Sequence, residues 1–588
     1  MNRNPPRLGF AIVLLSMSAS VCCGPLACTQ DEWTQMFDWK KDKGEQPKAT
    51  PRANSKSAAQ QDTIGQIAAF EGLRMMQVRG YGLVVNLAGT GGTDSPKIIK
   101  DHLAAEMRRR QPIGGPGTSA QEWLESHDTA VVEVSGLIPS AAEKGTRFDV
   151  AVRALGEQTK SLVGGRLVLC DMALYAETPS GVISGQTLAT AAGPIFISPF
   201  GRESSSATKA NPRMGLVLGG GIVQKPRRVR LVVSDPKYSD AVRIRNRINS
   251  LYGTLQPIAD AKSPGIIELS IPPEHRLRKK LFLDMVSHTT IISSEGFLEQ
   301  RTKDLAEEIQ HSEADYEGIA ITWEAIGRSV LPTVQGLYDS AAAPVRYYAG
   351  RTGLRMGDKA GLEVVATFAR DESSVFRDQA IEELGYALKM YQAGEVLRGL
   401  LNNSDDRVRI RAYRALRLHQ HPCIQTTVLD DDNLILDVID CKGPFLIYAQ
   451  RALSPRIAIF GAGLTSKTPA MYPNGADRDW EPRVQITGDR KTKDRLTVIY
   501  KNRVNGRTSP PMDAPLNVGE LIRFLGGKPV QDPNGRFTGL AVPYGEVLDV
   551  VAQLTASGTI PAKLEIERIQ ATDVLDFERP RERQESEY

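Results

Sequence analysis

The spacing of apolar and polar residues changes twice along the chain. From residue 63 it follows the two-residue period of β-strands, as in the run Arg147 to Leu155, where Phe148 and Val150 alternate with polar neighbours. Between about 298 and 418 the period becomes 3.6 and the composition turns to Ala, Leu, Glu and Arg. After residue 443 the strand pattern returns. These changes predict an α+β protein with β-rich parts on either side of an all-helical stretch.

A strand, helix and strand are predicted at 228–233, 240–252 and 266–271. One face of the helix carries the apolar residues, which are Ala241, Ile244, Ile248 and Leu251. Ser239 is a candidate cap at its start, and Gly253 is a candidate stop. The pattern indicates an α+β subdomain.

A short pattern recurs inside the helical stretch at a spacing of about thirty residues. Its three copies are Val345-Arg346 with Ala349, Phe376-Arg377 with Ala380, and Val408-Arg409 with Ala412. Repeats of this kind predict stacked helix pairs of the HEAT type, which bury their apolar faces against one another and expose a surface for partners. An irregular helical bundle is the alternative.

The length and net charge of the chain limit the number of domains and the classes of function. The chain has 588 residues, of which 41% are hydrophobic, and a net charge of +4. This length predicts two or three domains, and the small charge argues against a nucleic-acid binder. Beyond residue 28 the cysteines are Cys170, Cys423 and Cys441. We expect either three buried thiols or one disulfide between Cys423 and Cys441.

Both ends of the chain lack a core pattern. Arg3 and Arg7 precede an apolar run too short to span a bilayer, so residues 1–28 are predicted to be an export signal. Cleavage after small residues or lipidation at Cys28 would follow export. Residues 29–62 are polar and predict a flexible tether, and 570–588 predict a polar tail.

Candidate chemistry is sparse. The glycine-rich runs 89–92 and 461–468 resemble phosphate cradles. The first lacks the spacing of a nucleotide-binding motif, and the second has Ser466 where such a motif needs the glycine before its lysine. His419, His421 and Cys423, near the acidic residues 430–432, could hold a metal, although a polar loop is the favoured interpretation. We therefore predict no catalytic, cofactor-binding or metal-binding residues, and no enzymatic activity.

Two basic runs remain to be explained, Arg227-Arg228 with Arg230, and Arg276 with Arg278-Lys279-Lys280. They could meet an anionic partner such as a cell-wall polymer or an acidic neighbouring subunit. A solvated surface is the simpler interpretation.

The order of residues from Glu71 to Gly92 resembles the flagellar P-ring protein family, whose members carry the run G(V/L)R-x-x-Q-x-x-GYGLVVGL-x-GTGD. The matching positions include Gly72, Arg74, Gln77, Gly80, Tyr81, Gly82, Gly89, Thr90 and Gly91. Asn86 and Gly92 depart from that run. A second block matches the family at Asp149, Gly156, Lys160, Ser161, Gly164 and Gly165. We call these two sets the motif residues.

The resemblance extends to the end of the chain, where 444–569 is similar to the C-terminal part of the family. It implies a β-rich P-ring-like body, 63–297 and 444–569, split by a HEAT-like insertion at 298–443. The implied function is that of a structural component of the flagellar basal body, which assembles into a periplasmic ring around the rod and supports motility.

The implied partners are copies of the chain itself, the rod, the L-ring protein, peptidoglycan and an assembly chaperone. The helical insertion would bind a further, unknown envelope partner. The alternative is an envelope lipoprotein scaffold with a P-ring-like fold and no flagellar role. A nucleotide-dependent enzyme using residues 461–468 is a third, weaker hypothesis.

Overall fold

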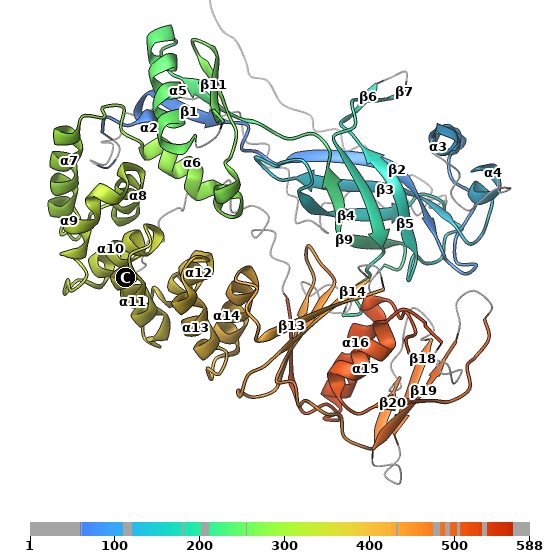
Figure 1. The fold of residues 1–588 in the computed structure, drawn as a ribbon. Helices are drawn as coiled ribbons and strands as arrows, with labels where there is room; N and C mark the ends of the chain where they lie inside the picture. The colour runs from blue at the N-terminus through green and yellow to red at the C-terminus, as the bar shows by residue number, and fades with distance from the viewer. Residues whose placement is uncertain are drawn as a thin grey trace, which may run out of the picture. The chain divides into compact units, whose positions relative to one another are not determined.

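The α+β class is confirmed, with β-rich parts before and after an all-helical region (Figure 1). No helix within the described ranges is long and apolar enough to cross a bilayer. The expected signal, Cys28, most of the tether and the polar tail lie outside these ranges. The computed structural model describes residues 59, 61–109, 120–178, 181–200, 211–253, 256–430, 433–473, 483–488, 494–501, 506–531 and 538–567.

The first β-rich part contains a closed antiparallel barrel in the order β2-β3-β4-β9-β8-β5. Its strands are β2 (Met76–Val85), β3 (Ala130–Ile138), β4 (Arg147–Ala154), β5 (Arg166–Met172), β8 (Ala189–Pro194) and β9 (Met214–Val223). The alternation predicted in β4 places Phe148, Val150 and Val152 in the barrel core. Closure leaves this sheet without free edges.

Two helices cover part of the outer surface of the barrel, α3 (Lys97–Arg109) and α4 (Ala120–Leu124). Leu103 and Leu124 from these helices pack against Leu83 and Val131 on the outer faces of β2 and β3. A separate hairpin is formed by β6 (Tyr175–Thr178) and β7 (Gly181–Ser184). The sequence pattern had not predicted α3 or α4.

The strand, helix and strand predicted at 228–271 are confirmed. The two strands belong to a four-stranded sheet in the order β1-β10-β12-β11. The elements of this subdomain are α2 (Ile64–Ile67), β1 (Ala68–Glu71), β10 (Val229–Val233), α5 (Tyr238–Tyr252), β11 (Ala259–Ser263), β12 (Ile266–Leu269), the 3-10 helix η2 (Pro273–Arg278) and α6 (Lys279–His288). Its core holds Ile244 and Ile248 of α5. Gly253 ends α5 as expected, but Ser239 does not cap it, because the helix already begins at Tyr238.

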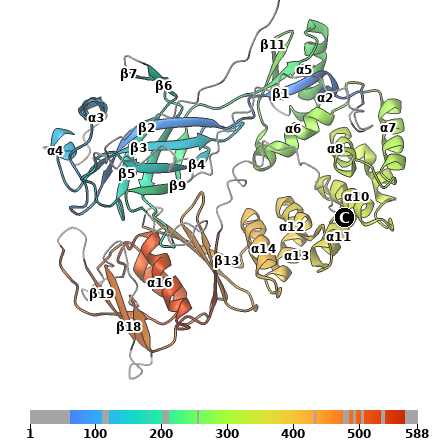
Figure 2. The same cartoon turned by 180° about the vertical axis from the view of Figure 1, so that it is seen from behind.

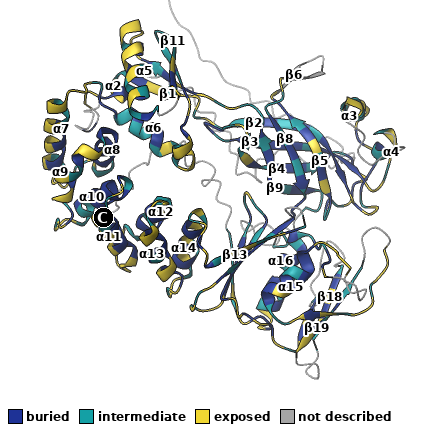
Figure 3. Ribbon diagram, in the orientation of Figure 1, coloured by how far each residue is buried: buried dark blue, intermediate teal, exposed yellow. Residues whose placement is uncertain are grey.

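The helical module, defined here as residues 295–418, confirms the predicted repeats. The repeat positions Val345, Ala349, Ala380, Val408 and Ala412 are at most 2% exposed. Its helices are α7 (Glu295–Glu308), α8 (Tyr316–Ile326), the 3-10 helix η3 (Arg328–Val330), α9 (Leu331–Gln335), α10 (Ala343–Arg355), α11 (Lys359–Arg370), α12 (Arg377–Tyr386), α13 (Tyr391–Leu400) and α14 (Asp406–Leu418). Buried and exposed residues alternate along them at helical spacing (Figure 3).

The C-terminal body contains two sheets, in the orders β13-β14-β16-β15-β21 and β17-β18-β19-β20. Helix α16 contacts strands of both (Figures 1 and 2). The elements are β13 (Ile424–Leu429), β14 (Leu434–Ile439), β15 (Leu446–Gln450), β16 (Arg456–Phe460), β17 (Ala470–Tyr472), β18 (Val484–Gly488), β19 (Arg495–Tyr500), β20 (Met512–Pro515), α15 (Val518–Gly526), α16 (Tyr544–Ala556) and β21 (Lys563–Ile566).

This body begins at Ile424, upstream of the boundary predicted at 443. The reason is that β14 pairs in parallel with β16, which places the hairpin β13–β14 in the main sheet. The hairpin was missed because Gln425 and Thr426 on β13 are polar and exposed. Asn517 caps α15, since its side chain accepts a hydrogen bond from the N–H of Glu520.

The main C-terminal sheet is buried on both faces. Along β15, Leu446 and Tyr448 belong to the core of the helical module, whereas Ile447 and Ala449 belong to the core beneath α15 and α16. The ring of Tyr413 on α14 lies 5.7 Å from the ring of Phe460 on β16. The helical module and this sheet therefore share one apolar core.

Candidate functional site

The motif glycines in β2 allow close packing where the barrel closes. An ideal Cβ on Gly80 would lie 2.3 Å from the carbonyl oxygen of Asp171 on β5. One on Gly82 would lie 2.9 Å from Leu167 Cδ1. Strand β2 pairs with both β3 and β5. These glycines are therefore needed because no side chain fits between the closing strands.

The loop after β2 turns sharply and binds its own neighbours. Gly89 adopts a φ of +82°, and its N–H donates to Asp128 Oδ1 at 2.7 Å. The N–H groups of Gly91 and Gly92 donate to the carbonyl oxygens of His127 and Thr129. Because these amides already have partners within the chain, the loop offers no free cradle to a phosphate.

The two motif blocks meet at this loop. Thr90 donates its hydroxyl to the carbonyl oxygen of Ser161 at 2.8 Å, and the N–H of Lys160 donates back to the carbonyl oxygen of Thr90 at 2.8 Å. Asp94 Oδ2 accepts from the N–H of Glu157 at 2.6 Å. An ideal Cβ on Gly156 would lie 2.2 Å from Asp94 Oδ1, so only glycine fits there.

The turn before β5 completes the cluster. Gly164 adopts a φ of +68°, and an ideal Cβ on Gly165 would lie 2.5 Å from Val84 Cγ1. The N–H of Gly165 donates to the carbonyl oxygen of Leu162. Motif residues from two loops, the one after β2 and the one between β4 and β5, therefore interlock at one end of the barrel, chiefly through backbone groups.

Other motif residues lie outside this cluster. Gln77 pairs with Leu137 along β2 and β3, and Tyr81 packs beneath α3 and α4. The carbonyl oxygens of Gly72 and Arg74 both accept from Arg227 Nη2, at 3.3 and 2.6 Å.

Asp149 joins the barrel to the C-terminal body. Its Oδ1 accepts from the N–H of Gly219 at 2.6 Å, and both of its oxygens accept from the N–H of Leu453 at 3.0 Å. Burial raises the pKa of this carboxyl, although the two backbone donors oppose the shift. Nearby, the rings of Phe196 and Tyr544 lie 5.3 Å apart. We refer to these contacts as the Asp149 junction.

The histidines and cysteines after α14 make local contacts. His419 Nε2 lies 2.9 Å from the carbonyl oxygen of Leu384, and His421 Nε2 lies 3.4 Å from Glu395 Oε1. The N–H of Cys423 lies 3.2 Å from His421 Nδ1. Across the described ranges, no three His, Cys, Asp or Glu side chains are grouped as metal ligands would be.

Cys423 and Cys441 flank the hairpin β13–β14, where the N–H of Asp440 donates to the carbonyl oxygen of Cys423 at 2.8 Å. Both cysteines, like Cys170, are free thiols here. Burial raises the pKa of Cys423 to about 11 and also raises the pKa of Cys441. Neither thiol is therefore primed as a nucleophile. A disulfide between them stays a prediction.

The run 461–468 does not form a phosphate-binding loop. The N–H of Ser466 donates to the carbonyl oxygen of Leu516, and that of Lys467 donates to the carbonyl oxygen of Thr559. A strand, β17, follows the run, whereas a phosphate-binding loop leads into a helix.

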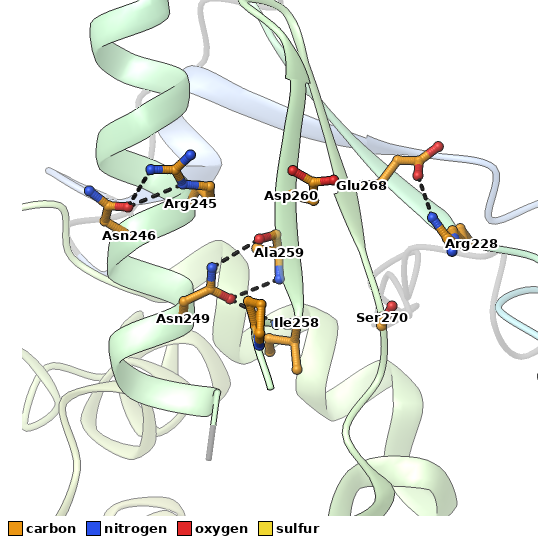
Figure 4. A pocket seen from close by; sticks show the side chains of 10 residues that line it. Arg228, Arg245, Asn246, Asn249, Ile258, Ala259, Asp260, Glu268 and Ser270 are labelled. Atoms are coloured by element: carbon orange, nitrogen blue, oxygen red, sulfur yellow. Dashed lines mark hydrogen bonds and ion pairs between the residues drawn. The ribbon is translucent and has the colours of Figure 1, made fainter. Parts of the chain in front are cut away.

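An open cavity of about 570 Å³ lies between α5 and the strands β11 and β12 (Figure 4). Its charged groups have partners on the protein: Arg228 pairs with Glu268 at 2.8 Å, and Asp260 pairs with Lys262 at 2.6 Å. Asn249 bonds to the backbone of Ile258 and Ala259. The lining residues include no Ser, Cys or Lys nucleophile paired with a base, and we assign no chemistry to this cavity.

The fold thus defines an α+β protein whose motif residues serve packing and backbone bonding. Comparison with known proteins finds two families whose models match this chain. The family model described as Flagellar P-ring protein matches residues 63–296, and the model described as HEAT repeats matches 330–417. Residues 63–296, which we call the P-ring domain, are therefore similar to that family, and residues 330–417 are similar to HEAT repeats.

Curated relatives bear the same name. Flagellar P-ring protein 1 of Bradyrhizobium diazoefficiens is 32% identical over 248 residues, which cover 40% of this chain and 62% of the relative. The flagellar P-ring proteins of Geobacter sulfurreducens and Caulobacter vibrioides are 30% and 31% identical over 37% and 39% of this chain. Those matches span 57% and 59% of the two relatives, so the chain spans about three fifths of the length of these proteins.

Proposed function

We propose that this chain is a structural, non-enzymatic component of the flagellar basal body. Many copies would assemble into a periplasmic P-ring-like ring around the rod and so support motility. The observation that carries the proposal is the interlocking of the two motif blocks through Thr90, Lys160 and Ser161, inside the region matched by the family model. A closed ring needs two complementary surfaces on each subunit and no active site.

The C-terminal body is proposed to complete the same subunit. Support comes from the Asp149 junction, where a motif residue of the barrel accepts hydrogen bonds from Leu453 of the C-terminal body. The proposed partners are other copies of the chain, the rod, the L-ring protein, peptidoglycan and an assembly chaperone. Residues 1–28 would direct export, with lipidation at Cys28 as an additional anchor.

Electron cryotomography of motors tests this proposal directly. A strain without the gene should lose the ring density around the rod at the level of the cell wall and should swim poorly, and the wild-type gene should restore both. A strain that keeps a complete ring and normal swimming would contradict the proposal.

A second candidate function is an envelope scaffold, a lipoprotein with a P-ring-like fold that binds partners through its helical repeats outside any flagellum. The HEAT repeats at 330–417 favour it, since they lie outside the region matched by the P-ring family model. In that case deletion would leave the motor intact, and a tagged protein would spread over the envelope rather than gather at motors.

A further inference from the structure

The basic run at 276–280 finds its acidic partners within the same chain. Arg276, on η2, pairs with Glu143 of the P-ring domain at 2.7 Å and is 57% exposed. Lys279 donates to the carbonyl oxygen of Ala141 at 2.8 Å. Arg278 differs from both, because its side chain is only 18% exposed and reaches the helical module.

Arg278 occupies a site formed by α12. Its Nη2 donates to Glu383 Oε1 at 2.6 Å, and Glu383 is itself 10% exposed. The guanidinium also lies 4.5 Å from the centre of the Tyr386 ring. A carboxylate beside an aromatic face is a combination that recognises arginine in particular, because guanidinium both forms directed hydrogen bonds and stacks.

The carboxylate at this site is held in place from behind. Arg355 on α10 donates to Glu383 Oε2 at 3.0 Å and, through Nη1, to Glu324 Oε2 on α8 at 2.6 Å. Arg351 Nη2 lies 3.6 Å from Glu324 Oε1. Three helices therefore contribute to one buried ionic network, which fixes the position of Glu383 before Arg278 binds.

The end of the predicted tether also contacts the helical module. Thr322 on α8 donates its hydroxyl to the carbonyl oxygen of Ala59 at 3.1 Å, and Ala59 is fully buried. The N–H of Ile291 donates to the carbonyl oxygen of Asp62. Ala59 of the predicted tether is therefore packed against α8, and α6 also contacts α8.

We propose that Glu383 and Tyr386 form an arginine-recognition site, and that Arg278 of the P-ring domain fills it and fastens the helical module to that domain. This inference holds whether or not the chain belongs to a flagellum. It means that this part of α12 already holds an intramolecular ligand. An envelope partner of the helical module must bind elsewhere or displace Arg278.

Hydrogen exchange on the full chain tests the contact. In Arg278→Met, the amides of α6 and α12 should exchange about tenfold faster or more, because a hydrogen bond between charged groups is lost. Exchange in β3 and β4 of the barrel should not change. Arg276→Met is the matched control, since that arginine lies in the same helix but is exposed, and it should leave α12 as in the wild type. Exchange in α6 and α12 of Arg278→Met within twofold of wild type would overturn the proposal.

Chemical rescue separates recognition of guanidinium from simple packing. Arg278→Ala leaves the site empty, and millimolar methylguanidinium should restore slow exchange in α12, while methylammonium should not. Restoration by both cations, or by neither, would overturn the assignment of an arginine-recognition site. Neither cation should change exchange in the wild type, where Arg278 occupies the site.

Discussion

The barrel and the helical module position their polar groups in opposite ways. In the barrel, the motif residues act mainly through backbone: Gly91 donates its N–H to the carbonyl oxygen of His127, and Gly80 makes room for β5. In the helical module, fully charged side chains form a buried network, with Arg355 between Glu324 and Glu383. We therefore expect the motif cluster of the barrel to be sensitive to added atoms, and the buried network of the module to be sensitive to the loss of a charge.

The difference predicts how each region responds to change. A backbone network depends on space and conformation, so it should be sensitive to added methyl groups and indifferent to acid. A buried ionic network depends on charge balance, since removing one member leaves another charge buried without compensation. Four experiments test this contrast, beginning with the largest expected effect.

Arg355→Met should destabilise the helical module by roughly 3–5 kcal/mol, because Glu324 and Glu383 would then be buried with too little positive charge. Urea unfolding followed by hydrogen exchange in α8, α10 and α12 measures the loss. Arg370→Met is the control: that side chain is 54% exposed and lies 4.0 Å from Glu363, so its loss should cost at most about 0.5 kcal/mol. Equal losses of stability in Arg355→Met and Arg370→Met would contradict the proposed role of the buried charge network.

Acid should affect the ionic network of the helical module and the Asp149 junction in opposite directions. Burial would raise the pKa of Glu383, but Arg355 and Arg278 outweigh it and hold the pKa at about 2. Because the folded pKa is lowered, its contribution of roughly 3 kcal/mol is fully present above about pH 4.5 and is lost as pH falls towards 2. Segment-resolved stability measured from pH 7 to 2 should show this late loss in α12.

Because the pKa of Asp149 is raised, stability at the Asp149 junction should depend on pH in the opposite direction. The folded state takes up this proton at a higher pH than the unfolded state, so this group's contribution should favour folding more as pH falls through the folded pKa. Asp149→Asn should abolish that slope while leaving the acid response of α12 unchanged. A junction that weakens steadily with mild acid in the wild type, and equally in the variant, would argue against this assignment.

Two glycine-to-alanine changes should change the free energy of unfolding in opposite directions. Gly91→Ala should cost roughly 1–3 kcal/mol, because its Cβ would lie 2.0 Å from the carbonyl oxygen of Thr129. Gly296→Ala, in α7, has nothing within 4 Å and should stabilise by roughly 0.5–1 kcal/mol through helix propensity. Thermal unfolding of the two variants compares them. Stabilisation by Gly91→Ala would mean that the loop is looser than described.

The smallest effect concerns helix caps. Asn517→Ala should cost about 1 kcal/mol, because Asn517 accepts the N–H of Glu520 at the start of α15. Ser294→Ala, at the start of α7, should cost less, since Ser294 makes no capping bond with its side chain. Chemical denaturation of the two variants measures the difference, and a reversed order would contradict the cap assignment.

Sequence reasoning succeeded where short-range pattern decides structure. The alternation around Phe148, the apolar face containing Ile244 and the repeat position Ala380 were each predicted from neighbours a few residues away. The motif blocks could also be recognised in the sequence, because glycine at a fixed spacing reflects a strict limit on space. Their contact through Thr90 and Ser161 is seen only in the structure.

What was missed depends on contacts between distant residues. Arg278 and Glu383 are separated by 105 positions, and nothing in the basic run distinguishes Arg278 from its exposed neighbour Arg276. Helix α3 escaped notice because its apolar face covers the outside of a barrel, with only Leu103 fully buried. The local pattern places Arg278 directly before the amphipathic helix α6, but that position does not indicate a partner on α12.

The sheet shared by the helical module and the C-terminal body determines where this protein can be cut. Excising residues 298–443, as the sequence boundaries suggested, would remove β13 and β14 and leave one side of β16 without its hydrogen-bonding neighbour. It would also expose the apolar face that carries Tyr448 and Phe460. An unpaired strand edge beside an exposed apolar surface favours aggregation of the chains. The repeats therefore cannot be removed together with β13 and β14, and a deletion that keeps the main sheet intact has to end before Ile424.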